Sequence, residues 1–370
     1  KSVSLPCEDP VTNAVNAARP IVDQLTEAEK NSIELVITAT ESGMDFGKSL
    51  STYVHDYLGL SRNCRLFEVK QACYGGTAAL HMAASHIAAN RSADAKALVI
   101  ATDTARASMK MEYLEPTQAA GAVALLVSRK PQILELDLGA NGYYSYEVMD
   151  ACRPDPEIET GDSDLTLLSY LDCLENSYLA YADKVDGTDF THTFDYLVFH
   201  TPFAGMVKGG HRKLMRQMKK AGPDEIETDF QKRVRPSLTY AMQVGNVYSA
   251  SAYLALCSLI DNSSHDDFRR VGIFSYGSGC SSEFYSGVLD PGAKRQLGKM
   301  NIGGKLAGRY NLDMGEYDSL LSLNKEWFFG VKDKTSDVAA YSKIYEHQAD
   351  GSGLLVLDQV HNYHRKYRWS

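Results

Sequence analysis

The stretch that decides the fold is residues 68–80, which read EVKQACYGGTAAL. A β-rich run over 65–69 leads into it, and an apolar, helix-forming run over 77–89 leads away from it. This pattern places Cys73 in a turn between a strand and a helix, where unpaired N–H groups favour a thiolate and can hold an oxyanion. A lone cysteine is more often a buried structural residue, so a catalytic assignment of Cys73 depends on the rest of the chain.

Apolar β-rich runs alternate with helix-forming runs on both sides of this turn, which predicts an α/β fold built in layers. The expected strands cover residues 33–40, 65–69, 97–102, 121–128, 196–200, 271–276 and 353–358. The expected helices cover residues 10–25, 49–58, 77–89, 165–183, 213–221 and 247–261. Residues 154–164 are rich in Pro, Asp and Glu and are expected to form an exposed loop between two halves, 1–153 and 154–370.

The bulk composition excludes several classes of protein. The chain has 370 residues, 44% of them hydrophobic, which suffices for two domains or one large duplicated domain. A formal net charge of −9 disfavours nucleic acid as a partner. Neither a membrane-spanning apolar run nor a signal peptide is visible. Since the sequence opens at Lys1 without an initiator Met, we expect a further segment before it.

Cysteine and histidine usage indicates a cytoplasmic protein without a metal. Seven cysteines are scattered without CxxC pairs, which indicates a reducing compartment and argues against structural zinc. The ten histidines include no HExxH motif or paired-ligand spacing, so no metal site is predicted.

Three polar side chains stand at the ends of predicted strands or the start of a helix. Glu41 follows the first strand, where a pocket would raise its pKa and make it a general base. His200 closes a later strand, and a neutral imidazole there can hydrogen-bond a thioester or ketone oxygen. Asn246 precedes a helix and can either cap it or donate to a carbonyl oxygen. Taken singly, a solvated glutamate, a satisfied histidine and a helix cap are the more common cases.

A glycine loop, YGSGC over residues 276–280, directly follows the strand predicted at 271–276. Gly277, Ser278 and Gly279 can offer backbone N–H groups to an oxyanion, although an ordinary tight turn reads the same way. The GxGxxG spacing is absent, so this loop does not predict a dinucleotide site.

Together these segments resemble 3-hydroxy-3-methylglutaryl-CoA synthase, a family of the thiolase superfamily. Five motifs occur in family order over nearly the whole chain: residues 70–80, Glu41 in Thr-Glu-Ser, 199–203, 245–248 and 274–279. The resemblance implies a thiolase-like fold, which is a duplicated, layered α-β-α-β-α architecture with the active site between the halves. It also implies a homodimer.

The resemblance also implies roles for individual residues. Cys73 resembles the acylated nucleophile, Glu41 the general acid/base, and His200 and Asn246 the groups that position the acceptor. Further residues match secondary or substrate-binding positions: Asp103, Asp150, Tyr74, Gly277, Ser278 and Gly279. The chain departs from the family at Ala151 and Cys152, where aromatic residues are usual, so the local pocket shape is expected to differ.

Within the family, residues 70–77 and 200–208 are most similar to the β-branching enzymes of polyketide assembly lines. Those enzymes act on acyl chains held by acyl carrier proteins rather than on free CoA esters. Basic residues then recur at helical spacing, at Lys208, Arg212, Arg216, Lys219 and Lys220. Such a stripe suits an acidic carrier protein or a phosphopantetheine phosphate, and an ordinary solvated helix face fits it equally well.

The expected reaction joins two acyl groups without a metal, nicotinamide or flavin; its thioester substrates are linked to phosphopantetheine. Cys73 takes an acetyl group from a donor carrier protein, and Glu41 removes a methyl proton to give an enolate. The enolate attacks the β-ketone of an acceptor on a second carrier protein, and water then releases the branched product from Cys73.

Three alternatives remain at this point. A CoA-dependent enzyme would perform the same chemistry. A ketosynthase of the superfamily would not need Glu41, and a catalytically silent partner subunit would not need Cys73, Glu41 and His200 together.

Overall fold

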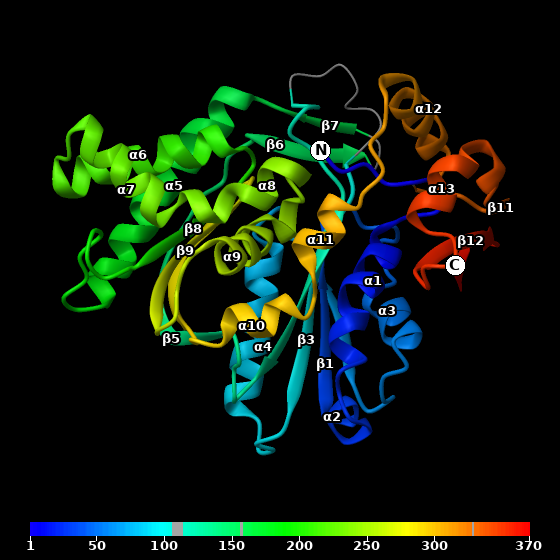
Figure 1. Cartoon of the computed structure of the whole chain (residues 1–370), viewed down its shortest axis with the longest axis horizontal. Coiled ribbons are helices and arrows are strands. Elements are labelled where there is room, and N and C mark those ends of the chain that lie inside the picture. Colours follow the sequence, from blue (N-terminus) through cyan, green and yellow to red (C-terminus); the bar gives the residue numbers. More distant parts are fainter. Residues whose placement is uncertain (106–113, 156–157, 328) are drawn as a thin grey trace.

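The computed structural model describes residues 1–105, 114–155, 158–327 and 329–370. Most of its strands form two four-stranded sheets (Figure 1). The first sheet has the order β2-β1-β3-β4 and comprises β1 (Ile33–Ala39), β2 (Arg65–Val69), β3 (Lys96–Asp103) and β4 (Gly121–Ser128). The second has the order β5-β10-β9-β8 and comprises β5 (Leu134–Ser145), β8 (Tyr196–Phe199), β9 (Arg269–Gly277) and β10 (Ser281–Leu289). In each sheet a parallel pair is followed by an antiparallel strand, β4 or β10, which is the sign of a duplication.

Helices cover both faces of both sheets, and α4 (Gly75–Ala89) and α9 (Ser251–Asn262) lie between them (Figure 1). Alternate residues of β1 explain this position, because Leu35 and Ile37 pack toward the inner helices while Val36 packs outward. The outer face of the first sheet is covered by α1 (Pro10–Val22) and α3 (Ser51–Tyr57). The outer face of the second is covered by α5 (Ser163–Lys184) and α6 (Ala204–Lys219). The predicted α-β-α-β-α layering is therefore confirmed.

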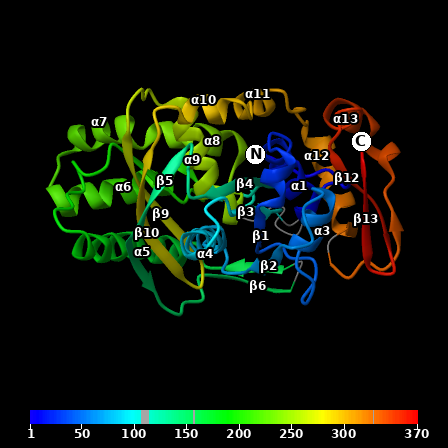
Figure 2. The same cartoon turned by 90° about the horizontal axis from the view of Figure 1, so that it is seen from below.

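The remaining elements extend this core. A three-stranded C-terminal sheet packs beside α1 and α3 (Figure 2). Its strands are β11 (Lys334–Thr335), β12 (Leu355–His361) and β13 (His364–Trp369). The other helices are α2 (Glu27–Asn31), α7 (Pro223–Arg233), α8 (Thr239–Val244), α10 (Ala293–Gly298), α11 (Ile302–Ala307), α12 (Met314–Asn324) and α13 (Ser342–Gln348). The 3₁₀ turns are η2 (Arg235–Leu238), η3 (Tyr248–Ala250), η4 (Lys325–Trp327) and η5 (Val338–Tyr341). In the described parts of the chain, every helix is too short or too polar to cross a bilayer.

The structure differs from the sequence-based prediction around the junction of the two halves. The chain passes from the first sheet to the second between β4 and β5, so β5, which the expected boundary at 153/154 assigns to the first half, pairs with β10. The loop expected at 154–164 is wrong, because β6 (Ala151–Asp155) and β7 (Ile158–Gly161) form a two-stranded hairpin that leads into α5. Both strands are partly exposed and short, so they lack the apolar alternation that marks a strand in sequence.

Candidate active site

Cys73 lies in the turn between β2 and α4, as its sequence context predicts. Ala72, the residue before it, has a φ of +43°, in the left-handed region. This sharp turn directs the half-buried Cys73 side chain toward the end of β1. There its Sγ donates a hydrogen bond to Oε1 of Glu41 at 3.2 Å. The two residues that the resemblance assigns to nucleophile and base are therefore in contact.

Two glycines allow the second half of the chain to close on this turn. A Cβ atom at Gly76 would lie 2.3 Å from the backbone oxygen of Ser249, and one at Gly277 would lie 2.5 Å from the backbone nitrogen of Tyr74. Any side chain at either position would push the two segments apart. The absence of these two side chains lets η3 and the 277–279 loop pack directly against the Cys73 turn.

Asp103 links the base to the second half. Its carboxylate is fully buried at the end of β3. One oxygen accepts hydrogen bonds from the backbone N–H of Glu41 at 2.8 Å and from the hydroxyl of Ser42 at 2.9 Å. The other accepts from the backbone N–H of Ser249 at 3.0 Å. Since both oxygens are occupied by the protein, Asp103 positions Glu41 rather than offering a group to substrate.

The environment of Glu41 suits a general base. Burial raises the pKa of Glu41 to about 7, the positive charge of Arg153 opposes that rise, and Asp103 and Glu159 add to it. The Arg153 Nε lies 3.7 Å from Glu41 Oε2, and its Nη1 donates to the Glu41 backbone oxygen at 3.1 Å. Glu159 pairs with Nη2 of Arg153 at 2.8 Å.

Arg153 and Glu159 were missed by sequence reasoning, because the hairpin β6–β7 that carries them was expected to be an exposed loop. The only available signal was the position of Arg153 three residues after Asp150, inside a segment that resembles the family.

The ionisation state of Cys73 differs from the prediction that its position near a helix start favours a thiolate. Burial raises its pKa well above the usual value, and the neighbouring Glu41 carboxylate raises it further. The resting side chain is therefore a neutral thiol whose proton points at the base.

His200 directly follows β8 and is 1% exposed. Burial lowers its pKa to about 3, so the imidazole is neutral across the physiological range. Its backbone oxygen accepts a hydrogen bond from Tyr170, while Nδ1 has no hydrogen-bond partner in the described ranges. A buried neutral ring with an unsatisfied nitrogen is suited to a substrate oxygen or proton.

The side-chain oxygen of Asn246 is used within the protein, while the role of this residue toward a substrate carbonyl stays a prediction. Its side-chain oxygen accepts from the backbone N–H of Tyr248 at 2.9 Å and from the Ser251 hydroxyl at 2.7 Å, so it caps the turn that begins α9. This orientation leaves the amide nitrogen as the donor that remains for a ligand.

Asp150 holds the glycine loop. Its carboxylate is fully buried and accepts from the Tyr276 hydroxyl at 2.6 Å and from the Gly279 N–H at 2.8 Å. The Gly279 N–H is therefore not available to an oxyanion, which corrects the expectation that the whole loop of Gly277, Ser278 and Gly279 offers its amides to substrate.

Tyr74 is also tied to the protein by its polar end. Its hydroxyl donates to Glu283 at 2.7 Å, and Glu283 is 1% exposed in the second half. Any contact of Tyr74 with substrate must therefore use its ring.

The basic stripe lies on α6, which begins four residues after His200. Lys208, Arg212 and Arg216 are exposed, while Leu214 and Met215 are buried against the second sheet, as the helical spacing predicts. Lys208 pairs with Glu227 at 2.8 Å. Within the described ranges no carboxylate lies within ion-pair distance of Arg212 or Arg216, so their charges are open to a partner.

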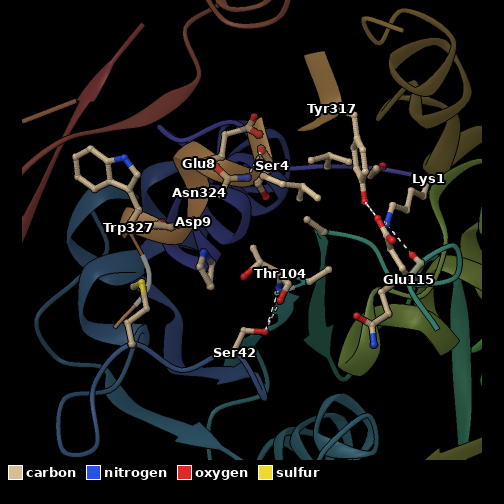
Figure 3. Close-up of a pocket in the computed structure, with 18 of the residues that line it drawn as sticks. Lys1, Ser4, Glu8, Asp9, Ser42, Thr104, Glu115, Tyr317, Asn324 and Trp327 are labelled. Atoms are coloured by element: carbon tan, nitrogen blue, oxygen red, sulfur yellow. Dashed lines mark hydrogen bonds and ion pairs between the residues drawn. The ribbon is translucent and has the colours of Figure 1, made fainter. Parts of the chain in front are cut away.

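A small cavity of about 50 Å³ lies beside this site, between the N-terminal segment, α12 and the loops after β1 and β3 (Figure 3). Ser42 and Thr104 line it and hydrogen-bond each other, but Cys73, His200 and Asn246 do not line it. We assign the chemistry to the Cys73 turn, because nucleophile and base meet there. Across the described residues, no cluster of three or more His, Cys, Asp or Glu side chains could hold a metal ion.

Comparison with known proteins shows which family the sequence matches. The model described as hydroxymethylglutaryl-coenzyme A synthase N terminal matches residues 13–132, and its C-terminal counterpart matches residues 215–368. The polyketide biosynthesis 3-hydroxy-3-methylglutaryl-ACP synthase PksG of Bacillus subtilis (strain 168) is 51% identical over 378 residues, with 100% of this chain and 90% of PksG covered.

Two solved structures widen the comparison. The curacin biosynthetic pathway HMG synthase in complex with holo donor-ACP superimposes with a TM-score of 0.97 and 54% sequence identity. The match covers 100% of this chain and 90% of the curacin chain. MvaS in complex with 3-hydroxy-3-methylglutaryl coenzyme A has a TM-score of 0.85 and 30% identity, with 100% and 89% covered. Sequence identity thus falls steeply from the structure that holds a carrier protein to the one that holds a CoA ester.

Proposed function

The chain belongs to the hydroxymethylglutaryl-CoA synthase family, and we propose that within it the protein condenses acyl groups held by carrier proteins. The reaction is the aldol addition of an enzyme-bound acetyl group to a β-ketoacyl thioester. It gives a β-branched 3-hydroxy-3-carboxymethyl chain in polyketide biosynthesis. The observation that carries the chemistry is the 3.2 Å contact between the Cys73 thiol and the Glu41 carboxylate. Identity of 51–54% to PksG and the curacin enzyme over the whole chain supports the carrier-protein substrates.

In the first step Cys73 attacks the donor thioester. Its proton has an acceptor in Glu41, through the hydrogen bond between them. The C–S bond to the donor phosphopantetheine breaks, the freed thiolate takes up a proton, and acetyl-Cys73 remains.

In the second step Glu41 removes a proton from the acetyl methyl group. A base whose pKa is about 7 is half ionised at neutral pH and still strong enough to take this proton. The resulting enolate attacks the β-carbon of the acceptor ketone, and the ketone oxygen becomes an alkoxide that is protonated. The neutral imidazole of His200 and the amide N–H of Asn246 are proposed to hold the acceptor oxygens. Water then cleaves the thioester and releases a carboxylate and the Cys73 thiol.

The carrier proteins are proposed to dock at Lys208, Arg212 and Arg216. Carrier proteins are acidic, and two of these three cations have no intramolecular carboxylate partner among the described residues. The stripe also begins at Lys208, eight residues after His200, on the helix that follows it.

We further propose a cytoplasmic homodimer. The seven free cysteines support a reducing compartment. The dimer is supported by β2, which stands at an edge of the first sheet, where a strand of a second copy can pair with it. Light scattering after gel filtration tests this, since a monomeric mass at micromolar concentration contradicts it.

The function is tested by comparing acetyl transfer to Cys73 from acetyl-carrier protein and from acetyl-CoA, followed by addition of a β-ketoacyl carrier protein. We expect acetylation from the carrier protein at a much higher kcat/KM and a mass gain on the acceptor that equals one acetic acid, that is, the carboxymethyl branch plus the hydrogen on the new hydroxyl. Preference for acetyl-CoA would support the second candidate, the CoA-dependent enzyme, which the relationship to MvaS favours. No acetylation from either donor would contradict both.

A further inference from the structure

A hydroxyl group without a partner in the described residues belongs to a ring that contacts Arg153, the charged neighbour of Glu41. Tyr248 is 3% exposed, and its Oη is buried without a hydrogen-bond partner in the part of the chain that the structure describes. Buried hydroxyl groups are satisfied in the great majority of cases, so an orphan points to a group that is absent from the resting protein. The backbone supports the same conclusion, because Tyr248 has a φ of +49°, which an aromatic residue rarely adopts.

The surroundings of this hydroxyl identify what it faces. The Arg153 guanidinium carbon lies 4.7 Å from the centre of the Tyr248 ring, and Arg153 in turn contacts Glu41. Burial raises the Tyr248 pKa well above its usual value; Glu159, Glu41 and the Cys73 thiol raise it further, while Arg153 opposes them. The phenol is therefore a neutral hydrogen-bond donor whose ring packs on the arginine beside the base.

The acetyl group gains from such a donor in addition to the backbone N–H groups of the Cys73 turn. When Glu41 removes a methyl proton, the C–H electron pair becomes the new C=C bond and the carbonyl π pair moves to oxygen, where negative charge develops. The Gly279 N–H is occupied by Asp150 and cannot meet that charge. A neutral hydroxyl in a buried site is well suited to stabilise it.

We propose that the Tyr248 hydroxyl donates a hydrogen bond to the carbonyl oxygen of acetyl-Cys73 and strengthens it as the enolate forms. No proton is transferred from Tyr248; it stabilises the oxyanion while Glu41 moves the proton. The inference rests on the proposed function, because it requires acetyl-Cys73 as the intermediate.

The test separates acetylation from enolate formation. Tyr248→Phe is incubated with acetyl-carrier protein in D2O without any acceptor. Intact mass reports acetyl-Cys73, and peptide mass reports the uptake of up to three deuterons by the acetyl methyl group. We expect near-normal acetylation and deuterium uptake slowed roughly 10²–10³-fold, which is the usual loss for one oxyanion donor.

A matched control is Tyr178→Phe, which removes the same hydroxyl from a ring buried in the core of the second half, packed on Phe190 and Phe284. It should exchange at the wild-type rate. The pH profile excludes an indirect effect through the base: Tyr248→Phe should lower the plateau of exchange without moving its midpoint. If the Tyr248 hydroxyl had a purely structural role, Tyr248→Phe would have a lower melting temperature than the wild type. Because this hydroxyl is unsatisfied in the described residues, we expect its removal to leave the melting temperature unchanged or to raise it.

Wild-type exchange in Tyr248→Phe overturns the proposal, as does a shifted midpoint with an unchanged plateau. Failure of the wild-type protein to form acetyl-Cys73 is a different result, since it overturns the proposed function itself.

Discussion

The thiol of Cys73 and the carboxylate of Glu41 are in hydrogen-bond contact although they stand 32 positions apart in the chain. The cause is the pairing of β1 with β2, which are parallel neighbours with Ala39 opposite Val69 at their carboxyl ends. Residues that follow two adjacent parallel strands leave the sheet at the same edge. Nucleophile and base are therefore brought together by strand order, before any side-chain interaction contributes.

Replacement of the nucleophile tests the assignment of Cys73. Cys73→Ala should fold normally and show no mass gain with acetyl-carrier protein, because the acyl acceptor is gone. Cys64→Ala, which removes another half-buried thiol, should acetylate as the wild type does. A normal acetyl mass gain in Cys73→Ala would show that another group is the nucleophile.

Removal of the base should separate the two steps. Glu41→Gln keeps the thiol and nearly the same shape, so acetyl-Cys73 should still accumulate, more slowly, and then stall. Condensation with a β-ketoacyl acceptor should fall roughly 10²–10⁴-fold, the usual loss for a general base. Single-turnover measurements that begin from isolated acetyl-enzyme give this rate directly. Condensation at the wild-type rate would show that Glu41 is an ordinary loop residue and not the general base.

The pKa of Glu41 predicts the pH dependence of enolate formation. Only the ionised carboxylate accepts a proton, so deuterium exchange into acetyl-Cys73 should rise about tenfold per pH unit and level off above about pH 7. His200 should add no inflection between pH 5 and 9, because burial lowers its pKa to about 3 and it stays neutral. A second inflection near pH 6.5 would contradict that assignment.

Arg153 should determine the pH at which deuterium exchange reaches half of its maximum rate. Its charge lowers the pKa of Glu41, so Arg153→Met should move the midpoint of the exchange profile to higher pH. Exchange at pH 6 should then fall about tenfold for every pH unit by which the midpoint rises, and much of the lost rate should return at pH 9. Arg269→Met, on the far end of β9 beside Asp195, is the control and should leave the midpoint in place. A lower rate at every pH with an unchanged midpoint would mean that Arg153 acts by geometry alone.

Charge reversal tests the carrier-protein surface. Arg212→Glu combined with Arg216→Glu should slow acetyl transfer from carrier protein at low salt, mainly through the association rate, and the defect should shrink at high salt. Transfer from acetyl-pantetheine should hardly change, since that donor carries no protein. Lys299→Glu with Lys305→Glu makes the same charge change just after α10 and on α11 and should have little effect. If the α6 variant and the wild type transfer acetyl groups from carrier protein equally fast, the stripe is an ordinary solvated helix face and not a docking surface.

Parts of the fold and site were accessible from sequence because their signals are local. The strand at 65–69, the helix that begins after Cys73 and the inward face of α6 follow from apolar periodicity and turn residues. The family motifs then predicted the duplicated layers. The hairpin β6–β7 was missed because its strands are short and partly exposed, and the Arg153 and Glu159 contacts to the base were missed with it.

The sequence by itself therefore determined the elements, the family and the identity of the reacting groups, since these depend on residue type and on neighbours within one turn. Only the tertiary structure decided how those groups behave. Burial, not the helix end, dominates the pKa of the Cys73 thiol, and Asp150 removes the Gly279 N–H from catalysis. Among the described residues, Tyr248 is left with an unsatisfied hydroxyl on a ring that contacts Arg153, which in turn contacts the base. Desolvation, charge proximity and hydrogen-bond satisfaction are properties of the space around a group, and residues far apart in the chain create that space.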